Sequence, residues 1–194
     1  MKKLLSVLLV MGFAFSVQAA DNPTERVKAG VQDIISIAAD AELDITQKRE
    51  KLAGVINTHV DLQASAQRVL ARYWRTATKE EKREFLKLFR SLLVNTYINL
   101  LDEYDNQVVA YKDEQIKKKV YAIVDTEIQS PDVVIPVSYR LYYRDNDWKI
   151  YDFVAGGISM IRSFSNDYQS TLKSKGVSGL NQALEEKLKA LEAK

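Results

Sequence analysis

The hydrophobic period of the chain changes near Asp105-Asn106, and this change limits the fold more than any other feature. Before it, apolar residues recur at i, i+3, i+4 and i+7, as on one face of an α-helix. After it, residues 133–144 alternate between apolar and polar side chains, as in a strand with one buried face. Short turns separate the strands, so consecutive strands must be antiparallel neighbours. The pattern predicts an α+β fold with a sheet between N-terminal and C-terminal helices.

Four helices are expected before the change. Asn22-Pro23-Thr24-Glu25 supplies a cap, a first-turn proline and an acidic residue for the first helix. The second helix is predicted over residues 46–59, and Asp61 starts the third. A capping box, Thr78-Lys79-Glu80-Glu81, opens a long fourth helix that continues to Tyr104.

About four strands and two further helices follow. The strands are predicted over residues 107–111, 118–129, 133–144 and 148–155, with turns at Ser130-Pro131-Asp132 and Asp145-Asn146-Asp147. Gly156-Gly157 leads into a helix that stops at Gly176, and a last helix carries leucines at 180, 184, 188 and 191.

The first residues are typical of a secretory signal peptide. Met1-Lys2-Lys3 precedes an apolar run to Val17, and Val17-Gln18-Ala19 has small residues where signal peptidase needs them. The apolar run is too short to span a bilayer, although an N-terminal membrane anchor is the alternative. We therefore predict a signal peptide over residues 1–19, cleavage near Ala19, and a single domain over residues 20–194. A chain that is exported and has no cysteine suits a bacterial periplasm.

The composition argues against an enzyme. Without cysteine there is no thiol nucleophile or thiolate metal site, and the one histidine, His59, has no partners for a triad or a zinc site. No phosphate loop or dinucleotide motif occurs. Removing Lys2 and Lys3 with the signal peptide brings the formal net charge from +2 to zero, so nucleic acid is not an expected partner.

Two short motifs each have a structural and a functional interpretation. Lys117-Lys118-Lys119 fits a solvated strand edge that discourages aggregation, or a docking site for an acidic partner or lipid head groups. Gly156-Gly157 fits a tight turn, or a helix start whose free N–H groups bind an anion.

Aromatic residues are concentrated on elements that should face one another. They include Tyr73, Trp74, Phe85, Phe89, Tyr97, Tyr139, Tyr143, Trp148, Tyr151 and Phe153. Such side chains could fill a core or line a cavity between the sheet and the helices. Periodicity alone does not separate the two.

Several blocks of the sequence resemble one family. Residues 70–78, Leu-Ala-Arg-Tyr-Trp-Arg-Thr-Ala-Thr, are similar to a segment of the toluene-tolerance family, the periplasmic phospholipid carriers of the Mla (maintenance of lipid asymmetry) transport system. The helix around Phe89-Arg90 and Thr96-Tyr97, the strand 148–153, the segment 157–161 and the stretch around Lys175-Gly176-Val177 also resemble that family. Gly156 departs from it, because an acidic residue usually stands there.

The resemblance implies a twisted antiparallel sheet packed against helices that enclose an apolar lipid cavity. It implies a monomer that carries phospholipid as cargo, needs no cofactor or metal, and exchanges lipid with two complexes. These are an inner-membrane ABC transporter with substrate-binding subunits and an outer-membrane lipoprotein associated with porins. The expected lipid-binding residues are Trp74, Phe89, Leu93, Tyr97, Val137, Tyr139, Leu141, Phe153, Gly157, Ile158, Met160 and Ile161.

Two other functions are compatible with the sequence. A periplasmic chaperone-like adaptor would bind an apolar protein segment on an exposed patch or groove, whereas a carrier should have an enclosed cavity. An enzyme on a cone-shaped fold would need an acid/base pair, and the sequence offers none at a suitable spacing.

Overall fold

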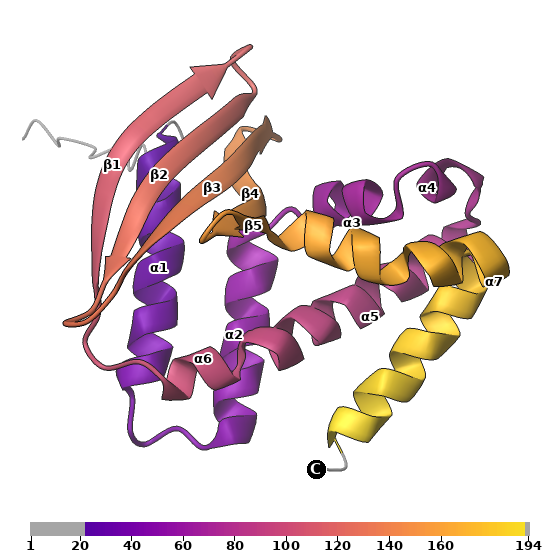
Figure 1. Cartoon of the computed structure of the whole chain (residues 1–194), viewed down its shortest axis with the longest axis horizontal. Helices are drawn as coiled ribbons and strands as arrows, with labels where there is room; N and C mark the ends of the chain where they lie inside the picture. Colours follow the sequence, from indigo (N-terminus) through magenta and orange to yellow (C-terminus); the bar gives the residue numbers. More distant parts are fainter. Residues whose placement is uncertain (1–21, 193–194) are drawn as a thin grey trace, which may run out of the picture.

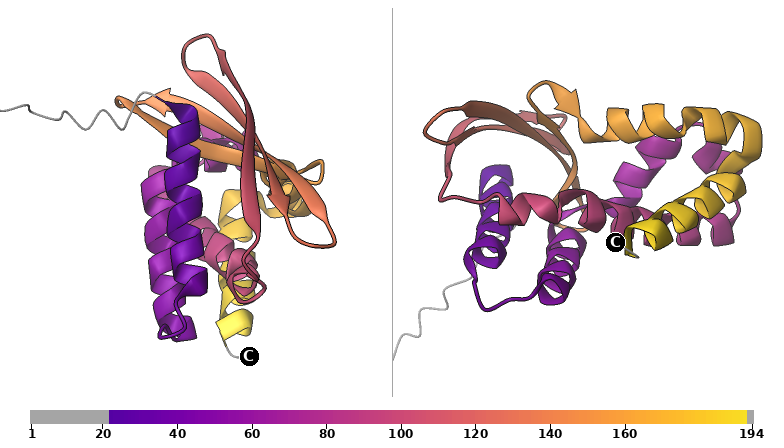
Figure 2. Two further views of the ribbon diagram at one scale, coloured as in Figure 1. Left: turned by 90° about the vertical axis from the view of Figure 1, so that its left-hand side faces the viewer. Right: turned by 60° about the horizontal axis from the view of Figure 1, so that its bottom comes forward.

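A curved antiparallel sheet lies over helix α1 and continues into a group of packed helices (Figures 1 and 2). This is a computed structural model, and it describes residues 22–192; the predicted signal peptide lies outside them. The sheet and helices make an α+β fold, as the sequence predicts. No helix within residues 22–192 is long and apolar enough to cross a membrane.

Three helices before the sheet begin at the caps that the sequence predicts, Asn22, Asp61 and Thr78. Asn22 Oδ1 accepts a hydrogen bond from the Thr24 N–H at 2.8 Å, and Thr78 forms a capping box. Asp44, which was not predicted as a cap, forms a capping box at the start of the second helix. The elements are α1 (Pro23–Ala39), α2 (Ile45–His59), α3 (Leu62–Leu70), α4 (Tyr73–Thr76), α5 (Lys79–Tyr97) and α6 (Asn99–Asp102).

The long helix ends earlier than predicted. We expected it to reach Tyr104, but α5 ends at Tyr97 and the short α6 follows. The chain tightens here, since the Leu101 N–H bonds to the Ile98 carbonyl, three residues back, at 3.1 Å. Ile98 and Leu101 are both buried, so the tighter turn brings two apolar side chains into the core.

The sheet has five strands in the order β1-β2-β3-β4-β5, each antiparallel to the next. They are β1 (Val108–Lys117), β2 (Tyr121–Gln129), β3 (Val134–Arg144), β4 (Asp147–Ala155) and the two-residue β5 (Ile158–Ser159).

The first strand is longer than predicted, and the second begins later. Most of β1 after Tyr111 is exposed at the sheet edge and is interrupted by a bulge, so no alternation marks it in the sequence. Lys118 and Lys119 form the turn between β1 and β2, both with positive φ, and β2 therefore starts at Tyr121 instead of residue 118.

After the sheet, helix α7 (Met160–Glu192) bends at Gly176, which has φ 67°. The predicted stop at this glycine is confirmed, and the segment after it forms a second helical arm. Leu180, Leu184 and Leu188 on this arm are buried in the helical core, while Leu191 is largely exposed.

The buried apolar residues form two separate clusters. The larger one joins α2, α3, α5 and α7, with Phe85 and Phe89 stacked at 5.5 Å at its centre. The smaller one joins Val27 of α1 to one end of the inner sheet face, around Leu141 and Trp148. Val137 is buried outside both clusters, while Tyr97, Tyr139 and Phe153 are only partly buried at their edges.

The β1–β2 turn provides a test of the local backbone. Two successive positive φ values in a hairpin turn favour Asn-Gly, whereas lysine is strained there. We expect Lys118→Asn/Lys119→Gly to raise the free energy of unfolding by about 1 kcal/mol, measured by urea denaturation. Unchanged or lower stability would show that the lysines are not strained in this turn.

Candidate functional site

The inner face of the sheet is largely apolar on its central strands β2, β3 and β4. Adjacent strands pair Val124 with Tyr139, and Tyr139 with Phe153. The next rows towards the β2–β3 turn pair Thr126 with Val137 and Ile128 with Ile135. Thr126 is buried, and its hydroxyl donates to the Val137 carbonyl at 3.0 Å, so it adds no unpaired polar atom to this face. We call the apolar surface formed by Val137, Tyr139 and Phe153 the wall.

One end of this face is closed. Leu141, which is fully buried, packs with Val27 of α1 and with Trp148 and Ile150 of β4. The structure therefore places Leu141 in a packed cluster, next to the wall formed by Val137 and Tyr139.

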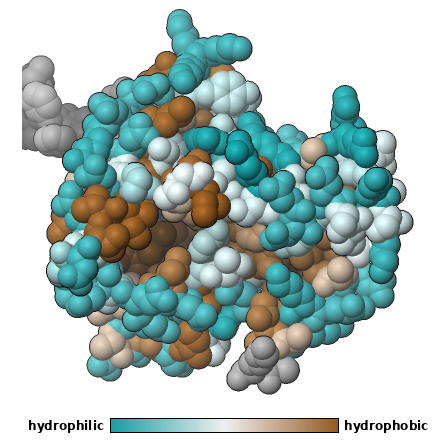
Figure 3. Space-filling view, in the orientation of Figure 1, coloured by the Kyte–Doolittle hydropathy of each residue, from teal (hydrophilic) through white to brown (hydrophobic). Residues whose placement is uncertain are grey.

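The other end is open. Large apolar residues are exposed there. Ile135 on β3 and Ile158 on β5 lie on the inner face, Val108 on β1 and Val134 on β3 lie on the outer face of the same end, and Leu100 is exposed on α6. Figure 3 shows that the molecule is hollowed beneath the sheet on this side, and that apolar side chains line the hollow. We call this end of the sheet the mouth.

Aromatic side chains lie between the two clusters. The Tyr97 and Phe153 rings meet edge to face with centroids 5.3 Å apart, which brings α5 against β4. Burial raises the pKa of Tyr97 to about 12, with a further contribution from the negative charge of Asp152. Burial also raises the pKa of Tyr139 to about 12. Both phenols therefore stay uncharged at neutral pH.

Three predicted wall residues lie in the helical cluster. Phe89 and Leu93 are buried on α5 among residues of α7 and α3. Trp74 is half-buried on α4, with the Lys82 Nζ 5.5 Å from its ring centroid. Since Lys82 lies in the first turn of α5 and Tyr97 ends that helix, Trp74 lies at the opposite end of α5 from Tyr97. The structure thus gathers Tyr97, Val137, Tyr139 and Phe153, and it separates Trp74 from them.

The predicted segment 157–161 lies at the mouth. Gly156 and Gly157 have φ of 55° and 83° and make a tight turn into β5, as one of the two interpretations expected. Ile158 is 67% exposed, whereas Met160 is buried and Ile161 packs on the helical cluster.

Asp152, which was not among the predicted site residues, holds this segment. Its carboxylate, only 2% exposed, accepts from Arg140 Nη1 at 3.0 Å, from Ser159 Oγ at 2.8 Å and from the Ile161 N–H at 3.1 Å. Ser159 Oγ in turn accepts from the Arg162 N–H. The Asp152 carboxylate and the Ser159 hydroxyl therefore already accept hydrogen bonds from N–H groups at the start of α7. The alternative interpretation of Gly156-Gly157 was that such N–H groups bind an external anion. An acidic residue in the middle of an apolar strand was the available signal.

The remaining candidates have structural partners. His59 is buried between α1 and α2, and its Nε2 lies 2.7 Å from Asp33 Oδ2. Among residues 22–192, no group of three or more His, Asp or Glu side chains is arranged to hold a metal ion. The apolar wall and the neutral phenols are suited to binding an apolar ligand.

Comparisons with known proteins identify the family. A protein-family model described as "MlaC protein" matches residues 28–186. The chain belongs to the MlaC family. The intermembrane phospholipid transport system binding protein MlaC of Haemophilus influenzae is 24% identical over 127 residues, which cover 63% of this chain and 59% of that protein. The toluene tolerance protein ttg2D of Pseudomonas putida is 22% identical over 176 residues, 88% of this chain and 82% of that protein.

A solved structure with the same fold contains a lipid. The phospholipid-binding protein from Ralstonia solanacearum, solved in complex with a phospholipid, has a TM-score of 0.77 and 26% identity. The match covers 86% of this chain and 97% of that protein. The resemblance to the toluene-tolerance family and the predicted α+β architecture are therefore confirmed.

In this MlaC-family chain, Asp152 should contribute more to the free energy of unfolding than a less buried carboxylate does. Asp152→Ala leaves a buried hydroxyl and an N–H without their acceptor, so we expect a loss of about 3 kcal/mol in the free energy of unfolding. Asp125→Ala is the matched control, because Asp125 also accepts from a serine hydroxyl, Ser138, on the same sheet but is less buried. It should cost about 1 kcal/mol by chemical denaturation. Equal losses would contradict a special role for Asp152.

Proposed function

We propose that this protein binds a phospholipid and carries it between the inner and outer membranes, as the soluble component of an ABC-type lipid transport system that maintains outer-membrane lipid asymmetry. The observation that carries the proposal is the incompletely covered apolar sheet face that opens at the mouth. The Ralstonia relative, which shares this fold and binds a phospholipid, supports it.

The physical task explains why such a wall suffices. Two acyl chains contain roughly 30 methylenes, and each favours an apolar environment over water by about 0.8 kcal/mol. Leaving a bilayer unaided therefore costs on the order of 20 kcal/mol. A carrier needs only to offer a comparable apolar environment. Val137, Tyr139 and Phe153 offer one without charge, and the head group would remain near solvent at the mouth.

The proposal includes a place and two partners. The protein acts in the periplasm after removal of residues 1–19, and it exchanges lipid with an inner-membrane ABC transporter that has substrate-binding subunits and with an outer-membrane lipoprotein–porin complex. Phospholipid is then cargo and not a cofactor, and no catalytic step is required. The names of the Haemophilus and Pseudomonas relatives, a phospholipid transport binding protein and a toluene tolerance protein, favour this function over the adaptor alternative.

Native mass spectrometry of protein purified from bacteria without detergent tests the function directly. We expect a protein monomer that carries one added mass in the range of two-chain phospholipids. A protein that carries only peptides would favour the adaptor, and a protein that is always empty would contradict the carrier.

The wall can be separated from the packed core by adding volume. Val137 is buried on the inner sheet face but belongs to neither cluster, whereas Leu141 is enclosed by the smaller cluster. Val137→Trp should therefore reduce bound lipid with little loss of stability, while Leu141→Trp should cost about 1–3 kcal/mol through overpacking. Lipid content by mass spectrometry and unfolding in urea measure the two effects. If Val137→Trp unfolds as readily as Leu141→Trp, then Val137 is also an ordinary core residue.

The mouth can be tested with a charge. Ile158→Glu places an ion where acyl chains or an apolar docking surface would lie, so lipid exchange with liposomes should slow while thermal stability stays unchanged, because Ile158 is exposed. Leu191→Glu, at the exposed end of α7, is the matched control and should exchange lipid normally. Normal exchange by Ile158→Glu would exclude β5 from the functional site.

A further inference from the structure

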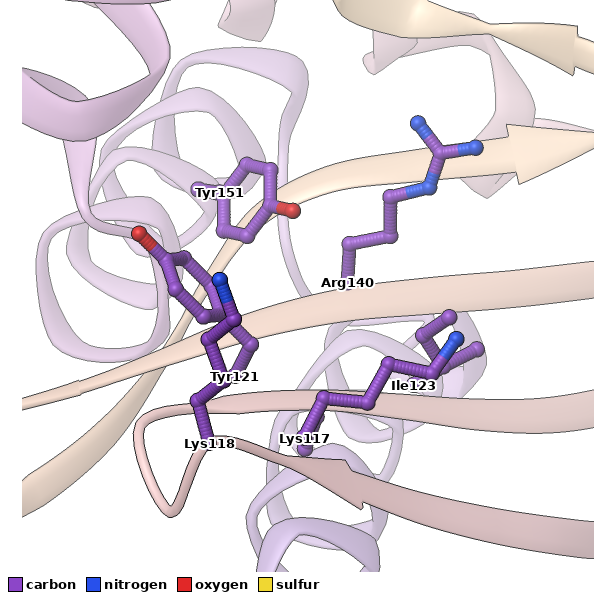
Figure 4. A pocket seen from close by; sticks show the side chains of 7 residues that line it. Lys117, Lys118, Tyr121, Ile123, Arg140 and Tyr151 are labelled. Carbon is purple, nitrogen blue, oxygen red and sulfur yellow. The ribbon is translucent and has the colours of Figure 1, made fainter.

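A second concave site lies on the outer face of the sheet. Its volume is about 410 Å³, and residues of β1, the β1–β2 turn, β2, β3 and β4 line it. Lys117, Lys118, Tyr121, Ile123, Arg140 and Tyr151 line it (Figure 4). We call it the outer pocket. The sheet itself separates it from the apolar wall, because Arg140 and Tyr139 are neighbours in β3 and point to opposite faces.

The outer pocket is positively charged. Three of its lining residues are cations and none is acidic. Across residues 22–192, no carboxylate lies within 4 Å of the ammonium group of Lys117 or Lys118. Arg140 is already engaged by Asp152, so the two lysines supply the unsatisfied charge. A site of this kind favours a ligand that brings its own carboxylates or phosphates.

Aromatic surface surrounds the charge. The Arg68 guanidinium carbon lies 3.9 Å from the Tyr151 ring centroid, and this stacking fixes one wall. Tyr121 stands beside Tyr142 with ring centroids 5.1 Å apart. Tyrosine and arginine are enriched at protein–protein interfaces, where each offers an apolar body with a polar end.

The β1–β2 turn also carries positive charge, at residues whose backbone conformation does not favour lysine. The β1–β2 and β3–β4 turns each contain two successive residues with positive φ. The β3–β4 turn uses Asp145 and Asn146, which tolerate this conformation, but the β1–β2 turn uses Lys118 and Lys119, which do so less readily. The lysine charge is therefore present at a position where backbone conformation alone would favour asparagine or glycine.

The location favours a protein over a membrane as the ligand. Lys117 ends β1 and Val108 begins it, so the two lysines and the mouth lie near opposite ends of a ten-residue strand, roughly 30 Å apart. The Arg140 side of the outer pocket lies nearer the mouth. A bilayer that contacted the lysines would be far from the site where lipid must enter. A flexible acidic segment can instead place carboxylates in a concave site and leave the mouth free.

We propose that the outer pocket docks an acidic segment of a partner protein through Lys117 and Lys118, with the tyrosines as its apolar contact. This docking goes beyond lipid carriage and does not depend on it, because the outer pocket and the lipid wall lie on opposite faces of the sheet. A partner bound there would hold the carrier without covering the mouth.

The test uses a fluorescein-labelled hexaglutamate peptide as the probe and fluorescence anisotropy at low salt as the measurement. We expect the full-length mature protein to bind this peptide, to bind it less as salt rises, and not to bind hexaglutamine. Lys117→Glu/Lys118→Glu should weaken binding by about tenfold. Lys51→Glu/Lys173→Glu, the same charge change at exposed positions on α2 and α7, should leave it nearly unchanged.

Equal losses in both double variants would overturn the proposal, since they would show a response to net charge alone. It would also fail if Lys117→Glu/Lys118→Glu kept the peptide but lost flotation with phosphatidylcholine–phosphatidylglycerol vesicles, because a membrane would then be the ligand. If charge reversal unfolds the hairpin, Lys117→Gln/Lys118→Gln gives the same comparison. Bound phospholipid should be unchanged in all of these variants, so a failure of docking is distinguishable from a failure of the carrier function.

Discussion

The buried carboxylate of Asp152 connects the two parts of this molecule. A charge with almost no solvent contact must be matched by charge and hydrogen bonds, and Arg140, Ser159 and the Ile161 N–H provide the match. Arg140 belongs to the middle of the sheet, whereas Ser159 and Ile161 lie at the junction of β5 and α7. The carboxylate therefore fixes where the helical group leaves the sheet. Because the two hydrophobic clusters do not merge, this polar link has a role that a continuous core would otherwise fill.

A second set of contacts joins the helices to β4, the strand that contains Asp152. In β4 the register shifts at Tyr151, which is left without a partner on β3. The Tyr151 carbonyl accepts from Ser65 Oγ at 2.7 Å, and the neighbouring Ile150 carbonyl accepts from the Asp61 N–H at 2.8 Å. The bulge thus attaches α3 to the sheet and turns the Tyr151 side chain to the outer pocket. With α1 at one end of the inner face and α3 and α7 holding β4, the sheet is supported at its sides while its mouth stays open.

Much of this arrangement could be predicted from the sequence, because its signals are local. The caps at Asn22 and Thr78 and the break at Gly176 depend on a few neighbouring residues, and the structure confirms them. Edge strand β1 was underestimated since an exposed strand has no alternation to read. The alternation in β3 placed Val137, Tyr139 and Leu141 on one face, but it could not show that Leu141 is buried in the cluster with Val27 of α1, that Tyr139 packs only partly buried against it, or that Val137 lies outside it. Which of the predicted residues contact a ligand depends on how distant elements pack, and the lipid contacts of Trp74, Phe89 and Leu93 stay a prediction.

The two faces of one sheet can serve different purposes because side chains alternate along each strand. In β3, Val137, Tyr139 and Leu141 supply an apolar surface, while Arg140 and Tyr142 face outward among charges and rings. A lipid wall needs no charge, and a docking site needs charge close to solvent, so the two could not share one face without exposing the lipid or burying the lysines. Arg140 is the residue common to both, since it lines the outer pocket and binds the Asp152 that holds β5 and α7. The position of the mouth and the charge of the outer surface therefore depend on the same side chain.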